Sequence, residues 1–148
     1  MLELFRQFAA EQLAVPADWL TAEPVVRGEH LYAAPAGLPE LAGIRVIRPG
    51  WYLGSAHRGR FEPAHALALG LKADDALRSA RLPLGDDRVI RYLRGETLSL
   101  AKEELRLAGD RAQAKGYALV CLGDYPLGWA KWQDGLLKNE YPPGWRWT

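Results

Sequence analysis

The chain has 148 residues, of which 49% are hydrophobic and 25% charged, and its formal net charge is +1. These values are typical of one globular domain or two small ones, long enough to bury a core without disulfides or metal. The small net charge excludes a polycation, so any binding of nucleic acid must depend on a local basic patch.

Cysteine content and the start of the chain indicate the compartment. Cys121 is the only cysteine, which excludes an intrachain disulfide and a zinc site built from cysteines. No apolar run approaches the ~20 residues of a membrane span. The early acidic residue Glu3 and the lack of a long apolar stretch there argue against a signal peptide. We therefore expect a cytoplasmic chain with no membrane partner.

The first predicted elements are a helix and short strands. Apolar residues recur at helical spacing over residues 1–13, and Pro16 ends the helix. Brief apolar runs or alternating patterns then predict strands at 24–28, 30–33, 44–48 and 51–54. The strand at 44–48 is expected to present one basic face to solvent.

A basic loop precedes the second predicted helix. The loop contains His57, Arg58 and Arg60, and the helix is expected to begin at Glu62 or Pro63, because proline suits the first helical position. A basic, glycine-containing loop that leads into a helix N-terminus can hold a phosphate. A solvated turn with surface arginines explains the same pattern.

The second half of the chain predicts one more helix and a group of strands. The helix should be capped by Asp86 or Asp87 and extend through Arg94, with its apolar side chains turned inward. Those inward residues are expected to be Val89, Ile90 and Leu93. Residues 101–115 fit either a helix or a long loop. Strands are predicted at 117–122, 125–132 and 136–138, with Asp134-Gly135 as a hairpin turn.

The sequence shows no pattern for catalysis or for metal binding. The histidines at 30, 57 and 65 lack ligand spacing, and His65 is interpreted as a half-buried residue with a satisfied ring. Cys121 lies in an apolar strand, as an inert thiol would. Phosphate-loop, dinucleotide and nucleophile-elbow motifs are not found. We therefore predict no enzyme activity, no cofactor and no metal.

Cations and aromatic rings recur together. Arg45, Arg48, Arg58 and Arg60 lie within sixteen residues that contain no acid, and Lys131, Lys138 and Arg146 surround Trp129, Asn139 and Tyr141. Cations hold phosphates, rings stack on unpaired bases, and an amide can hydrogen-bond to a base edge. The four tryptophans of the last twenty residues leave two interpretations open, namely core rings of a small barrel or exposed stacking rings.

Four motifs follow one another in the chain, RFEPAHALA at 60–68, YLRGE at 92–96, PLGWAK at 126–131 and LKNEYPPGWR at 137–146. In this order they resemble the C-terminal region of the RsmF-type methyltransferases, members of the Nol1/Nop2/Sun (Fmu) family that make 5-methylcytosine in rRNA. Pro143 stands where the family usually has a lysine. The catalytic domain, with its S-adenosylmethionine loop and two catalytic cysteines, has no counterpart here, so Cys121 inherits no catalytic role.

The resemblance implies an α+β fold with two parts. Residues 1–75 would form a small α+β sub-domain like the family's first C-terminal domain. Residues 76–148 would form a PUA-like small β-barrel with flanking helices. It also implies binding to rRNA or tRNA.

We therefore predict a non-catalytic RNA-binding protein that assists RNA modification or ribosome biogenesis. The predicted RNA-binding residues are Arg48, His57, Arg58, Arg60, Arg94, Trp129, Lys131, Lys138, Asn139, Tyr141 and Arg146. One alternative is a protein–protein adaptor that docks through the apolar face of its first helix. Another is a split accessory subunit of an S-adenosylmethionine-dependent RNA cytosine methyltransferase.

Overall fold

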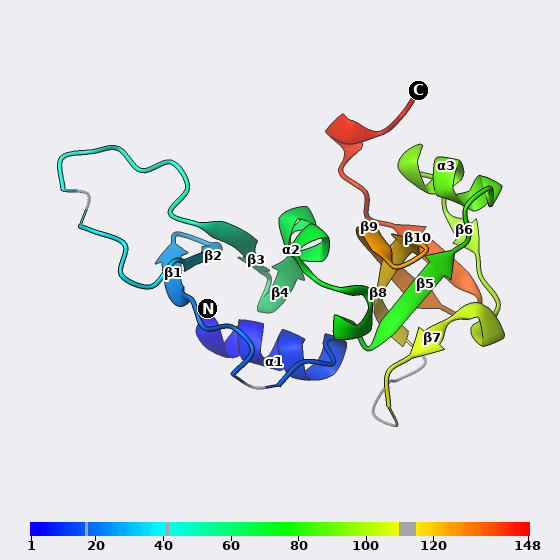
Figure 1. Cartoon of the computed structure of the whole chain (residues 1–148), viewed down its shortest axis with the longest axis horizontal. Coiled ribbons are helices and arrows are strands. Elements are labelled where there is room, and N and C mark those ends of the chain that lie inside the picture. The colour runs from blue at the N-terminus through cyan, green and yellow to red at the C-terminus, as the bar shows by residue number, and fades with distance from the viewer. Residues whose placement is uncertain (17, 41, 110–114) are drawn as a thin grey trace.

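The computed structural model describes residues 1–16, 18–40, 42–109 and 115–148, which form two sheets side by side with helices packed against them (Figure 1). The first sheet is antiparallel, in the order β1-β2-β3-β4. Its strands are β1 (Glu23–Arg27), β2 (His30–Ala34), β3 (Trp51–His57) and β4 (Arg60–Pro63).

The second sheet is longer and has the order β6-β10-β9-β8-β5-β7. Its strands are β5 (Arg78–Leu82), β6 (Leu98–Ser99), β7 (Arg106–Leu107), β8 (Lys115–Leu122), β9 (Tyr125–Gln133) and β10 (Leu136–Asn139). Strands β5 and β8 run parallel, while the other pairs are antiparallel. The sheet is a curled half-barrel accompanied by few helices, so the predicted α+β class is confirmed.

Within the described ranges, three α-helices and three short 3-10 turns complete the fold. The helices are α1 (Leu2–Gln12), α2 (His65–Gly70) and α3 (Asp87–Leu93). The 3-10 turns are η1 (Ala73–Asp75), η2 (Lys102–Glu104) and η3 (Pro143–Trp145). None of the described helices is both long and apolar enough to cross a bilayer.

Local sequence signals explain where several elements begin and end. Asp86 caps α3 by accepting a hydrogen bond from the backbone N–H of Arg88 at 2.9 Å. The helix ends just before Gly95, whose φ of +86° suits a residue without a Cβ. Asp134 and Gly135 both have positive φ, the geometry of the tight turn that joins β9 to β10.

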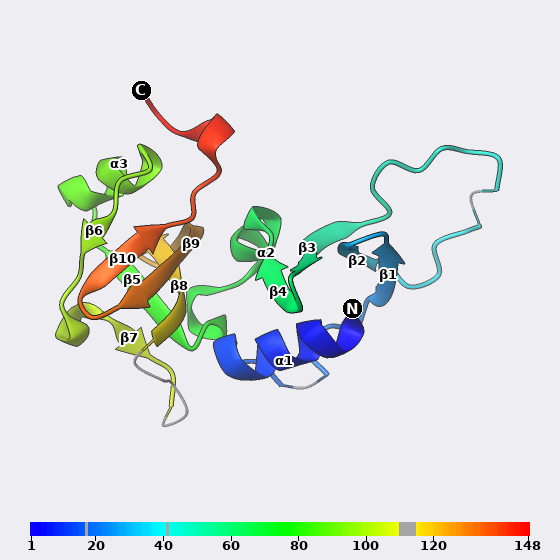
Figure 2. The ribbon, with the colours of Figure 1, turned by 180° about the vertical axis from the view of Figure 1, so that it is seen from behind.

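Among the residues that the structure describes, the buried side chains form two clusters. Phe5 and Phe8 of α1 pack with Phe61 of the first sheet, and the same cluster contains Leu119 and Trp129 of the second. Helix α1 therefore joins the two sheets, as the view from behind shows (Figure 2). This cluster includes residues on both sides of the predicted domain boundary at 75/76, which stays a prediction.

Two predicted elements differ from the structure. Residues 44–48 are not a strand but part of the long connection between β2 and β3, which extends away from the sheets (Figure 1). Ile47 is 79% exposed there, because no described strand lies beside this segment to bury its alternating pattern. Helix α2 begins at His65, since Glu62 and Pro63 pair with β3 instead.

The inward face of α3 also differs in one residue. Val89 and Leu93 are buried as predicted, but Ile90 is exposed. Tyr92 takes the inward place, and its hydroxyl donates a hydrogen bond to the Trp129 carbonyl at 2.8 Å. The inward face of α3 therefore carries an aromatic residue in place of the expected isoleucine, and the hydroxyl of this aromatic residue bonds to a buried acceptor.

Candidate nucleic-acid interface

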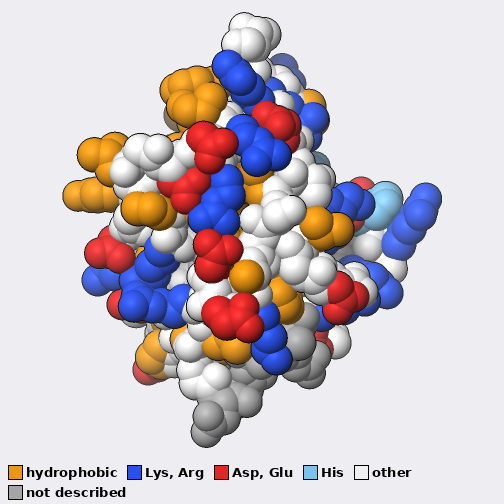
Figure 3. Space-filling view, turned by 90° about the vertical axis from the view of Figure 1, so that its right-hand side faces the viewer, with side chains coloured by type: hydrophobic (Ala, Val, Ile, Leu, Met, Phe, Trp, Pro, Cys, Tyr) orange, Lys and Arg blue, Asp and Glu red, His pale blue; other side chains and the backbone are white. Residues whose placement is uncertain are grey.

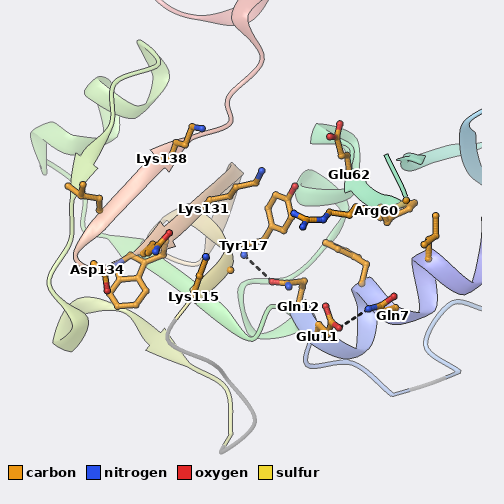
Figure 4. A pocket seen from close by; sticks show the side chains of 18 residues that line it. Gln7, Glu11, Gln12, Arg60, Glu62, Lys115, Tyr117, Lys131, Asp134 and Lys138 are labelled. Carbon is orange, nitrogen blue, oxygen red and sulfur yellow. Dashed lines mark hydrogen bonds between the residues drawn. The ribbon is translucent and has the colours of Figure 1, made fainter. Parts of the chain in front are cut away.

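A groove of about 880 Å³ lies between α1, β4 and one face of the strands β8, β9 and β10 (Figure 4). Its basic residues are Arg60, Lys115, Lys131 and Lys138. They come from four different strands, so tertiary structure brings them together. We call this hollow the basic groove.

The strand register sets three of the groove side chains in one row. Tyr117 of β8 lies opposite Lys131 of β9, which lies opposite Lys138 of β10. Residues that pair across neighbouring strands point to the same face, so all three face the groove. The next row on this face consists of Lys115, Gln133 and Leu136.

Arg60 faces this sheet from the other wall of the groove. It begins β4, directly after the turn formed by Arg58 and Gly59, which both have positive φ. In Figure 4 its side chain points toward Tyr117. The predicted phosphate loop at 57–61 is therefore a β-hairpin turn, and no helix N-terminus lies at its end, because β4 intervenes before α2.

Acidic side chains balance part of the positive charge in the groove. Glu11, Glu62 and Asp134 also line it. Lys131 lies 3.6 Å from a carboxylate oxygen of Glu140, and its ammonium lies 5.2 Å from the centre of the Tyr117 ring. Arg60, Lys115 and Lys138 form no ion pair with the residues that the structure describes.

Two predicted RNA-binding residues have structural roles instead. Trp129 is 2% exposed, and its indole N–H donates a hydrogen bond to the Ala64 carbonyl at 3.1 Å. A ring with no free face cannot stack on a base, so the prediction for Trp129 is wrong. The amide of Asn139 donates to the carbonyls of Tyr92 and Glu96 and accepts from the Tyr141 N–H, so both of its donors are already used within the chain.

Tyr141 and His65 meet in a small aromatic cluster. The Tyr141 ring packs edge-to-face against His65 at 5.3 Å and near Tyr92 at 5.5 Å. The Nδ1 atom of His65 is buried without a hydrogen-bond partner among the described residues. The prediction that the hydrogen-bonding groups of this ring are all satisfied is therefore wrong. Burial lowers the pKa of His65, which favours the neutral ring.

The remaining predicted residues lie outside the groove lining. Arg48 belongs to the exposed β2–β3 connection, and His57 ends β3 at the hairpin that also carries Arg58. Arg94 and Arg146 lie together near the end of α3. The other arginines of α3 are paired, Arg88 with Asp86 and Glu104 and Arg91 with Glu96.

The face of the barrel seen from the side of α3 differs from the groove. Acidic and basic side chains are intermixed across it (Figure 3). The arginines Arg88 and Arg91 on that side are held in ion pairs, whereas three of the four groove cations form none with the described residues. Cations without an acidic partner attract a polyanion more strongly, so the groove is the better candidate for the interface.

Sequence reasoning missed Lys115 and Tyr117 as groove residues. Lys115 ends the segment 101–115, whose sequence fits either a helix or a long loop, and residues 110–114 of that segment lie outside the described residues. Tyr117 was placed in a buried strand, without regard to the face it occupies. The signal was available in the alternation of β8, which places Lys115, Tyr117 and Leu119 on one face.

The described residues hold neither a metal cluster nor a reactive thiol. They contain no group of three His, Cys, Asp or Glu side chains that could ligate a metal ion. Burial raises the pKa of the Cys121 thiol to about 12, so it stays protonated at neutral pH.

Comparison with known families gives two matches in chain order. Residues 7–71 match the model of the RsmF rRNA methyltransferase first C-terminal domain. Residues 79–147 match the model of the methyltransferase RsmF PUA domain. The second match covers β6–β10 and all but the first residue of β5, and it therefore includes β8, β9 and β10, which form one wall of the basic groove.

Proposed function

The chain belongs to the RsmF family of rRNA methyltransferases and matches the C-terminal region of that family. We therefore propose that it binds RNA in the basic groove. We also propose that this binding assists RNA modification or ribosome biogenesis. Arg60, Lys115, Lys131 and Lys138 contact the phosphate backbone in this proposal. The chain itself carries out no chemistry.

The single observation that carries this proposal is the convergence of these four cations in one groove. Strands in a sheet lie about 4.8 Å apart, so Lys131 and Lys138 present adjacent charges on neighbouring strands. Arg60 adds a guanidinium from the opposite wall (Figure 4). Phosphate oxygens accept their strongest hydrogen bonds from charged donors, such as the ammonium and guanidinium groups that surround this concave surface.

The aromatic ring in the groove supports backbone contact in preference to base contact. Lys131 lies over the Tyr117 ring, and the rings of Phe8 and Trp129 pack against it edge-on. The ring therefore has little free face on which a base could stack. Glu11, Glu62 and Asp134 limit how close a phosphate can approach their part of the groove.

Neutralising three groove cations tests this proposal. In the triple variant Arg60→Gln, Lys115→Gln and Lys138→Gln, we expect weaker binding of an rRNA hairpin with a flatter salt dependence. Each phosphate contact contributes about 0.7 to 0.9 to the magnitude of the slope of log K against log salt, so the loss of three contacts should reduce that magnitude by about two to three. Fluorescence anisotropy over a series of salt concentrations measures both quantities.

A matched triple variant controls for the change in net charge. Arg27→Gln, Lys72→Gln and Lys102→Gln removes three exposed cations outside the groove lining. The control should keep nearly the wild-type slope. Equal losses in the two triple variants would show that binding follows overall charge, and the groove would not be the site.

The adaptor alternative loses the surface on which it depended. Phe5, Phe8 and Leu13 are buried within the chain's own core, and Leu4 is half-buried. The apolar face of helix α1 packs against both sheets and so joins them. It is therefore not available to dock another protein without opening the fold.

A further inference from the structure

The C-terminal tail carries two exposed tryptophan rings among arginines. Trp145 is 61% exposed and Trp147 is 53% exposed. Arg94 and Arg146 are also exposed and lie beside them at the end of α3. We call Arg94, Trp145, Arg146 and Trp147 the tail surface. It lies on the side of the barrel away from α1 (Figure 1).

The tail surface is fixed to the barrel. The N–H of Trp147 donates to the Leu93 carbonyl at 2.9 Å, and the N–H of Trp145 donates to the Pro142 carbonyl at 3.0 Å. The Arg146 guanidinium lies over Gly95, where any Cβ would clash with it. A ring held in place loses less conformational freedom when a ligand stacks on it.

The aromatic cluster beneath the tail supports the Trp145 ring. Trp145 packs edge-to-face against His65 at 5.1 Å, and Asn139 ties the start of the tail to the end of α3 through Tyr92 and Glu96. Both rings stay exposed although the backbone that carries them is anchored. Their position suits a flat ligand with a negative charge near it.

We infer that the tail surface binds unpaired bases of the same RNA whose backbone the groove holds, which rests on the proposed function. Indole rings stack on any exposed base, and the flanking guanidiniums can hold its phosphates. The groove offers no comparable free ring. A duplex hides the faces of its bases, so the tail surface selects RNA with a loop or another single-stranded segment.

Two RNAs separate this inference from the proposed function. The full chain is titrated with a labelled hairpin that has an unpaired loop and with a blunt duplex of the same length and charge. In Trp145→Ala/Trp147→Ala we expect hairpin affinity to fall about tenfold for each ring lost, while duplex affinity and the salt slope stay unchanged. The groove triple variant should instead weaken both RNAs. If the wild-type chain binds neither RNA, the proposed function fails first.

A matched control and a second variant keep the outcome clear. Tyr125→Ala removes an exposed ring that stands next to Asp124 outside both surfaces, and it should change neither affinity. Trp147→Ala alone preserves the contact of Trp145 with His65 and should still cost about tenfold on the hairpin. Equal losses on hairpin and duplex would overturn the inference. Unchanged affinity for both RNAs would overturn it as well. This holds also if sedimentation shows that the tryptophan variants have only lost self-association.

Discussion

Replacing Trp129 with alanine is expected to lower the free energy of unfolding by about 4 kcal/mol, the usual cost of deleting a buried large aromatic ring. The ring packs against Phe8 of α1 and Tyr117 of β8, and its N–H bonds to the residue that caps α2. The cavity would therefore open where the two sheets are joined. Denaturant unfolding followed by far-UV circular dichroism measures the loss.

Trp129→Phe is the matched control for this prediction. It keeps an apolar ring and removes the bond to Ala64, so we expect a smaller loss of stability than for alanine. The folded fraction of either variant should bind RNA with wild-type affinity. A Trp129→Ala protein as stable as the wild type, with weakened RNA binding, would place this ring on the RNA surface and contradict the structure.

Replacing Arg78 with alanine is expected to cost about 3 kcal/mol of unfolding free energy, because buried acceptors lose a charged donor. The Arg78 side chain is fully buried at the start of β5. Its guanidinium donates to the Tyr117 carbonyl at 3.0 Å, to the Glu11 carbonyl at 3.5 Å and to the Gln12 side chain. The arginine thus links the end of α1 to β8.

Arg81→Gln is the control on the same strand. Arg81 pairs with Asp74 and Asp124, whose side chains are exposed, so its removal should cost much less than that of Arg78. Thermal unfolding of the two variants in parallel gives the comparison. Equal losses of stability would mean that burial of Arg78 contributes nothing beyond a surface ion pair.

Local signals in the sequence predicted the hairpin and part of the groove. The two-residue turn Asp134-Gly135 fixes the register of β9 and β10, and this register alone places Lys131 opposite Lys138. Asp86 likewise identified the start of α3. Such features depend on residues close in sequence, so their geometry follows from the chain itself.

Other features depend on neighbours that a sequence does not reveal. The alternation at 44–48 is typical of a strand, but no described strand lies beside it to pair. Pro63 would suit a helix start, but pairing with Gly54 holds it in β4. Trp129 and Trp145 are the same residue type in one short region, and only the packed structure separates the core ring from the exposed one.

The sequence alone does not predict the groove either, because the groove also depends on contacts between distant parts of the chain. Arg60 and Lys115 come from different sheets, and they line one hollow only because α1 packs against both. The RNA-contact roles of Arg48, His57, Arg58, Arg94 and Arg146 stay predictions. Their positions differ, since Arg94 and Arg146 belong to the tail surface and Arg48 lies in the β2–β3 connection.

The distribution of lysines allows the most direct measurement of where RNA binds. The chain has five lysines, of which Lys115, Lys131 and Lys138 line the groove while Lys72 and Lys102 lie outside it. Acylation of the native chain, with and without an rRNA hairpin, is read by mass spectrometry for each lysine. We expect RNA to protect the three groove lysines and to leave Lys72 and Lys102 unchanged. Protection of Lys72 and Lys102 with unprotected groove lysines would contradict the account.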